Sequence, residues 1–232
     1  VPAIPVTRIF YILEVTTTSL PSGSVANSYS ARVQATLGAT GVYTWSLTDA
    51  SCLSGSGLSL NAATGYVSGN HPNAGTYVCE YNATDSGATA SKELTIVIAT
   101  GANTITWAGP RSVPRNYGPI TLNGTSNSGL PIQYTSNTPD ICTVLNGVVT
   151  IHQSGHCDID ANDPGDENWD PATPVSRGFY ILEVVTDSLT SGTAGTAYSQ
   201  TLQANLGPTG SYLWTATTDC LRFSGLTLNA GT

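Results

Sequence analysis

The sequence contains no methionine and one lysine, Lys92, and charged residues occupy 9 % of its 232 positions, well below the usual quarter or so. The formal net charge is −8. Without a basic surface the chain cannot neutralise a phosphate backbone, which excludes nucleic acid as a partner. The longest apolar runs, such as 94–99, are far too short to cross a bilayer. Hydrophobic residues still make up 40 % of the chain, so packed cores are expected and disorder is not.

Five cysteines in a chain rich in Ser and Thr favour an oxidising, extracellular or cell-surface compartment. The alternative is five free buried thiols in a cytosolic protein. The first residue is Val, and no signal peptide is recognisable. We therefore expect a processed chain or a segment of a longer one.

One stretch, FYILEV, occurs twice, at 10–15 and at 179–184. Aligned without a gap, residues 1–50 and 170–219 share 27 identical positions, as a direct count along the sequence gives. An internal repeat with an offset of 169 residues predicts an array of modules.

The repeat divides the chain into four segments. Residues 1–15 are expected to be the tail strand of a preceding module. Residues 16–99 form a complete module, here called the first type, and residues 100–184 form a different module, the second type. Residues 185–232 are the first part of another first-type module.

Apolar and polar residues alternate along several stretches of the first-type module, and turn residues separate them. The sets that share one face of a strand are Val33, Ala35 and Leu37; Tyr43, Trp45 and Leu47; Tyr77, Cys79 and Tyr81; Leu94, Ile96 and Ile98. In the second-type module the candidate strands are 104–107, 120–122, 132–135, 141–145, 148–152 and 157–161. Asn146-Gly147 predicts a type I′ hairpin turn. We predict an all-β fold of β-sandwich modules without significant helix.

The first-type module resembles the bacterial immunoglobulin-like domains found in tandem in large surface proteins. The stretches that carry the resemblance are YTWSL, GLSLNAATGYVSG and NAGTYVCEYNATDSGATASKELTI. Asn73-x-Gly75-x-Tyr77-x-Cys79 is similar to a tyrosine corner, and Trp45 matches the core tryptophan of such folds. The second-type module resembles another bacterial repeat family of small all-β modules, through 128–131, 134–136 and 165–175.

The resemblance implies a disulfide at Cys79. In such folds the partner cysteine precedes the strand that carries the core tryptophan, and this chain has no cysteine there. Cys52 follows the tryptophan strand instead of preceding it, and we predict a Cys52–Cys79 bridge. A second bridge, Cys142–Cys157, is predicted if the hairpin between the two residues does not hold them apart. Cys220 has no partner within the sequence, so either its partner lies beyond residue 232 or it forms an intermolecular bond.

Acidic residues gather in residues 158–170. Oxygen ligands for Ca²⁺ could come from Asp158, Asp160, Asp163, Asp166, Glu167 and Asp170. The spacing is not that of an EF-hand, and the alternative is a solvated acidic loop. His152 and His156 are placed on a strand–turn–strand segment, where a zinc pair is not expected. No cofactor is predicted, with calcium as the alternative.

Aromatic residues raise the question of sugar-stacking platforms, but Trp45 and Trp214 occupy equivalent inward-facing positions that favour core packing. Trp169, in the acidic stretch, has no such explanation. Two N-glycosylation sequons begin at Asn82 and Asn123. The sequence shows no catalytic triad, nucleophile elbow, phosphate loop or paired carboxylates, so we do not expect an enzyme.

Three functions are compatible with these features. The first is a structural, non-enzymatic role in an extracellular or cell-surface fibre, stalk or filament, with copies of itself or neighbouring repeats as partners. The second is an adhesin or carbohydrate-binding module with cell-surface glycans as partners. The third is a spacer in a large secreted enzyme. The repeated strand also permits assembly by strand addition, although covalent continuity is simpler.

Overall fold

The structure, a computed structural model, describes residues 11–205, 213–215, 221, 224 and 226–229. The chain forms two compact units. Unit 1 comprises Val1–Asn103 with Pro164–Pro171, and unit 2 comprises Thr104–Asp163 with Ala172–Thr232. Each is built from β-strands, and the one helix among the described residues is a short 3₁₀ turn, η1, at Ala50–Leu53. The all-β prediction is confirmed.

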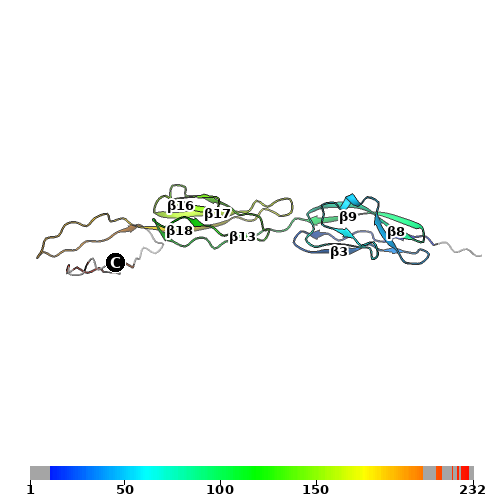
Figure 1. Ribbon diagram of the computed structural model, residues 1–232, viewed down its shortest axis with the longest axis horizontal. Helices are drawn as coiled ribbons and strands as arrows, with labels where there is room; N and C mark the ends of the chain where they lie inside the picture. The colour runs from blue at the N-terminus through cyan, green and yellow to red at the C-terminus, as the bar shows by residue number, and fades with distance from the viewer. Residues whose placement is uncertain (1–10, 206–212, 216–220, 222–223, 225, 230–232) are drawn as a thin grey trace, which may run out of the picture. The chain divides into compact units, whose positions relative to one another are not determined.

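Unit 1 is a sandwich of two main sheets, with strand orders β2-β9-β8-β5 and β3-β7-β6, and a further pair β1-β4. Its two longest strands, β8 and β9, form an antiparallel hairpin (Figure 1). The bounds are β1 Glu14–Val15, β2 Gly23–Ser24, β3 Tyr29–Arg32, β4 Ala35–Thr36, β5 Thr44–Leu47, β6 Ser59–Leu60, β7 Tyr66–Gly69, β8 Gly75–Asp85 and β9 Ala88–Ala99.

The core of unit 1 follows from the period-two pattern of its strands. Along β8, Cys79, Tyr81 and Ala83 are buried while Glu80 is exposed, and Leu94, Ile96 and Ile98 of β9 are buried beside them. Trp45 is also buried, at 4 % exposure, which confirms the core interpretation. Burial raises the pKa of the Tyr81 phenol to about 12.

Unit 2 contains a sheet of order β11-β18-β17-β14, a sheet of order β12-β16-β15 and a pair β10-β13, and β19 joins the end of β18. Its core includes Trp107, Val149, Ile159, Phe179 and Ile181. The bounds are β10 Ile105–Thr106, β11 Val113–Pro114, β12 Ile120–Thr121, β13 Thr125–Ser126, β14 Gln133–Ser136, β15 Cys142–Leu145, β16 Val148–Ile151, β17 Gly155–Asn162, β18 Val175–Val184 and β19 Ala204–Asn205.

The turn between β15 and β16 has the predicted conformation. Asn146 and Gly147 have φ of 50° and 73°, the left-handed pair that a type I′ hairpin requires. Their positive φ values match the right-handed twist of the two strands, so the sequence signal and the backbone agree.

The units differ from the sequence-based boundaries in four places. Residues 100–103 belong to unit 1, and residues 185–232 are grouped with unit 2. The other two differences concern segments 1–15 and 164–171. Glu14 and Val15 pair with Thr36 and Ala35 in unit 1, so the described end of segment 1–15 is part of the first-type module. Residues 164–171 belong to unit 1 although their neighbours on both sides belong to unit 2. Neither change is visible in the sequence, because both depend on pairing between residues far apart in the chain.

Candidate functional site

Both predicted disulfides are present in the structure. Cys52, in η1, is bonded to Cys79 on β8 with a Cα–Cα distance of 5.5 Å. Cys142 and Cys157 lie 5.8 Å apart, and both are fully buried. The intervening hairpin brings the two residues together, because β15 leads through β16 back to β17. Cys220 lies outside the described residues.

The tyrosine corner forms as the sequence pattern predicts. The Tyr77 hydroxyl donates to the carbonyl oxygens of Asn73 at 3.0 Å and Ala74 at 3.3 Å. Gly75 has a φ of 152°, and a Cβ at that position would lie 3.1 Å from the Tyr77 hydroxyl oxygen. The ring therefore packs over the glycine and fixes the start of β8, four residues before Cys79.

A carboxylate that sequence reasoning missed, Asp85, secures the loop between β4 and β5. Its side chain is 2 % exposed and accepts from the Thr40 hydroxyl at 2.7 Å, the Thr40 amide at 2.9 Å and the Gly41 amide at 2.8 Å. Hydrogen bonds led by that from the Thr40 hydroxyl lower the pKa of Asp85 to about 2. The sequence signal was an acid immediately before the Ser86-Gly87 turn.

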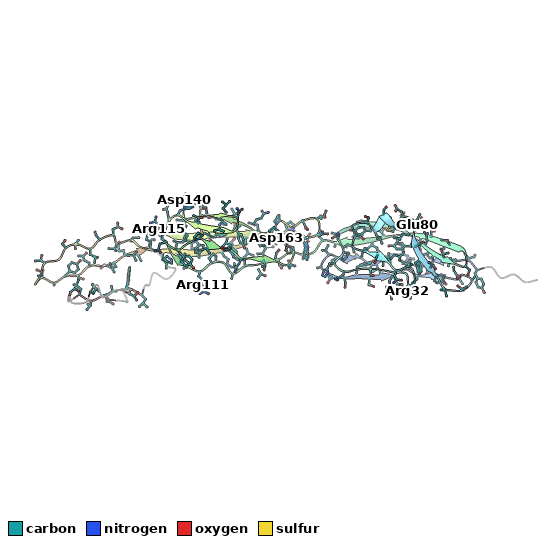
Figure 2. The ribbon with its side chains drawn as sticks, viewed as in Figure 1. Arg32, Glu80, Arg111, Arg115, Asp140 and Asp163 are labelled. Atoms are coloured by element: carbon teal, nitrogen blue, oxygen red, sulfur yellow. A yellow bond between two sulfur atoms is a disulfide. The ribbon has the colours of Figure 1, made fainter. Side chains whose placement is uncertain are left out.

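The acidic residues of 158–170 have separate structural roles. Asp160 on β17 accepts from the Ser176 hydroxyl, which lowers its pKa. Asp163, labelled in Figure 2, is buried and accepts from the Ser128 hydroxyl at 2.8 Å. Asp166 accepts from the amides of Asn168 and Trp169, which closes a tight turn.

The remaining acids serve individually as well. Asp158 lies 3.7 Å from His156, Asp170 accepts from Thr100, and Glu167 is exposed. Within the part of the chain that the structure describes, no group of three or more His, Cys, Asp or Glu side chains could hold a metal ion. This donor arrangement does not match the several converging oxygens that Ca²⁺ takes, so calcium stays an untested prediction.

The two histidines make different contacts. His152 Nε2 lies 2.9 Å from the Thr143 hydroxyl, whereas the His156 ring contacts the Tyr180 ring at a tilt of 57°, with centroids 4.7 Å apart. Each ring is thus placed by its own cross-strand neighbour, as expected for a strand–turn–strand segment.

Trp169 packs in unit 1 beside the hydrophobic core. Asn168 and Asp170 exchange backbone hydrogen bonds with Gly101, and Asn168 Oδ1 accepts from the Ala74 amide at 2.8 Å. A Cβ on Gly101 would lie 2.6 Å from the Trp169 ring. Segment 164–171 therefore closes against the end of β9, and Trp169 is a packing residue.

The two sequons differ in accessibility. Asn82, on β8, uses its amide nitrogen to donate to Thr48 at 3.0 Å, and its oxygen accepts from Ser91 at 2.6 Å. Asn123 is exposed in the loop that follows β12. Only the second sequon presents its amide to solvent without first breaking cross-strand hydrogen bonds.

The repeated strand serves two kinds of module. In the second copy, Ile181 is fully buried in the core of unit 2, whereas its counterpart Ile12 is 77 % exposed. At the other end, Val15 is 2 % exposed in unit 1, whereas its counterpart Val184 is 58 % exposed. The start of the second copy thus packs in the core of unit 2, and the end of the first copy packs in the core of unit 1.

The second copy of the first-type module repeats the hydrogen bonds of the first copy. Glu183 and Val184 pair with Asn205 and Ala204, as Glu14 and Val15 pair with Thr36 and Ala35. Two further bonds recur. The Tyr29 hydroxyl donates to the Pro21 carbonyl, as Tyr198 does to the Thr190 carbonyl. The backbone amide of Gln34 donates to the Thr17 hydroxyl oxygen, as that of Gln203 does to Thr186. The sequence repeat is therefore also a structural repeat.

Comparison with protein families finds a match to the first-type module. Residues 12–99 match the model of the family described as "Putative Ig domain". The segment is therefore similar to that family, as its sequence motifs indicate. The match begins three residues before Val15, so it includes β1, which pairs with β4 in unit 1.

Solved structures that are similar to the chain include extracellular cadherin domains and a surface-located polysaccharide-binding protein, all at low identity. Extracellular cadherin domains 1–4 of protocadherin gamma B7 share 11 % identity, with 74 % of this chain and 49 % of that chain covered and a TM-score of 0.39. Drosophila N-cadherin EC1–4 shares 13 % identity, with 77 % of this chain and 52 % of that chain covered and a TM-score of 0.31. A SusE-like surface-located polysaccharide-binding protein of Bacteroides thetaiotaomicron shares 15 % identity, with 75 % of this chain and 35 % of that chain covered and a TM-score of 0.33.

The chain thus spans about half the length of the two cadherin structures, or less for the third protein. These scores are too low to support an argument about function. No curated protein matches the sequence. Among the described residues, no helix has the length and apolar character needed to cross a membrane.

Proposed function

We propose that the chain is a structural, non-enzymatic repeat segment of a long extracellular or cell-surface fibre, stalk or filament. The observation that carries this proposal is the shared strand, Val175–Val184, which closes one module and opens the next without a linker. Because one continuous strand belongs to both, successive modules are covalently joined through β-structure. Copies of the chain or neighbouring repeats are its partners in the fibre.

The disulfides support an extracellular location, since such bonds persist in oxidising compartments. The scarcity of charge supports durability, because a chain with one Lys and six Arg offers few sites to proteases that cleave at basic residues. One disulfide joins residues that are 27 positions apart in the sequence, and the other joins residues 15 positions apart. The residues between the paired cysteines therefore stay covalently closed in a loop when the chain is pulled.

Non-reducing mass spectrometry and electron microscopy of the native material test the proposal. We expect a heavy chain seen as a thin fibre, with an axial repeat of roughly 60–80 Å for two modules whose strands rise ~3.3 Å per residue. A discrete species of the mass of this chain, 24.0 kDa, that stays monomeric would sink the fibre proposal.

The alternative proposal is an adhesin or carbohydrate-binding module. Tyr66 on β7 is 44 % exposed, and the guanidinium of Arg32 lies 5.8 Å from its ring centroid. An exposed aromatic ring beside a cation and the Ser30 and Ser68 hydroxyls is a combination that sugar-binding faces use. A glycan array tests this: binding by the parent that Tyr66→Ala abolishes supports it, and an array without signal contradicts it.

A further inference from the structure

A glycine occupies the repeated strand where the first copy has a branched residue. β18 lies between β17 and β11 in its sheet, and Gly178 faces Asp158 across the β17–β18 ladder. Glycine weakens strands, whereas isoleucine favours them. At the equivalent position the first copy carries Ile9. The glycine therefore calls for a local explanation.

The space above Gly178 is filled by two side chains from β17. A Cβ at this position would lie 2.4 Å from Cε1 and Nε2 of His156 and 2.6 Å from Oδ1 of Asp158. The His156 ring contacts the Tyr180 ring at a tilt of 57°, with centroids 4.7 Å apart, and its Nδ1 lies 3.7 Å from Asp158 Oδ2. Both side chains are partly exposed, so they can move, but only by giving up these contacts.

The other differences between the two copies do not meet such an obstacle. Aligned over 1–15 and 170–184, the copies differ at four positions: Val1/Asp170, Ile4/Thr173, Thr7/Ser176 and Ile9/Gly178. Thr173 and Ser176 are exposed, and a Thr in place of Ser176 keeps the hydroxyl. Asp170 belongs to unit 1. Position 178 is therefore the place where the residue of the first copy, Ile9, would meet side chains of β17 if it replaced the residue of the second copy, Gly178.

We propose that His156 and Asp158 make this second-type module select the glycine-bearing copy of the repeated strand and reject the isoleucine-bearing copy. Near-identical strands in one array can exchange, within a chain or between two copies of it, which is a known failure of repeat proteins. The His156–Asp158 pair over Gly178 opposes that exchange.

Substitutions in the full chain test the proposal, because it predicts whether each one lowers or raises the stability of unit 2. Gly178→Ile should lower the folded-to-unfolded ratio of unit 2 about tenfold, although strand propensity alone predicts an increase. With His156→Ala and Asp158→Ala already present, the same substitution should raise the ratio. Native-state hydrogen exchange at the amides of Ile159 and Ile181 measures it. A Gly178→Ile protein as stable as the parent, or more stable, overturns the proposal.

Refolding with peptides tests the selection directly. The full chain is refolded from urea with an excess of a fluorescent peptide of residues 2–15, of the same peptide carrying Ile9→Gly, or of residues 171–184 as the matched control. The two glycine-bearing peptides should be retained about tenfold more than the Ile9 peptide. Equal retention of all three, or a preference for the Ile9 peptide, refutes the selection.

Discussion

Removing the Cys52–Cys79 bridge should destabilise unit 1 by roughly 3.5 kcal/mol. This figure follows from the chain-entropy model, applied to the sequence separation of 27 between the two cysteines. The same model gives about 3 kcal/mol for Cys142–Cys157, whose separation is 15. The longer loop has more conformational freedom in the unfolded chain, so its closure contributes more.

The assay is native-state hydrogen exchange with the two double variants, Cys52→Ala/Cys79→Ala and Cys142→Ala/Cys157→Ala. The amides of Tyr81 and Ile96 report on unit 1, and the amides of Ile159 and Ile181 report on unit 2, because these residues are fully buried in their respective cores. Each double variant should lose protection in its own unit and keep it in the other.

Reducing agent distinguishes the bridges further. Cys52 is partly exposed, whereas Cys142 and Cys157 are fully buried, and thiol exchange requires access to a sulfur atom. Mild reduction should open the first bridge while unit 2 remains folded. A loss of less than ~1 kcal/mol in either double variant, or equal losses in both units, would refute this reasoning.

Three further predictions concern single positions. Hydrogen bonds led by that from Thr40 lower the pKa of Asp85 to about 2, below its unfolded value of about 3.9, so they stabilise the fold at neutral pH. This contribution should be lost as the pH falls from about 4 to about 2, and thermal melts of Asp85→Asn should lack that part of the pH dependence. Gly101→Ala should cost ~1–3 kcal/mol by overpacking against the Trp169 ring; urea unfolding measures it, and Gly118→Ala, with open space around its Cβ, is the control. A similar cost for both alanines would contradict the packing role of Trp169. In a host that attaches N-linked glycans, intact-mass analysis should show glycan at Asn123, removed by Asn123→Gln, whereas glycan at Asn82 alone would contradict the accessibility argument.

The fold class and the repeat could be predicted from the sequence alone. The Cys52–Cys79 bridge was predicted with the help of the family resemblance, and the Cys142–Cys157 bridge only on the condition that the hairpin between the two residues brings them together. Alternation of apolar and polar residues is a local property, because successive strand residues point to opposite faces, and it correctly placed Trp45, Cys79, Tyr81 and Ile96 in the core. The Asn146-Gly147 turn was equally readable, since its left-handed backbone conformation is specific to a few residue types.

Only the tertiary structure decided what Trp169, Asp85 and Gly178 do. Trp169 lies 68 residues from Gly101 in the sequence and in contact with it in the fold, and Asp85 reaches a loop 45 residues away. The presence of glycine at position 178 is explained only by the nearby His156 and Asp158 side chains, which a Cβ there would approach too closely. These roles depend on contacts between side chains that are far apart in the sequence and meet only when the sheets have formed. A local sequence pattern does not predict such contacts.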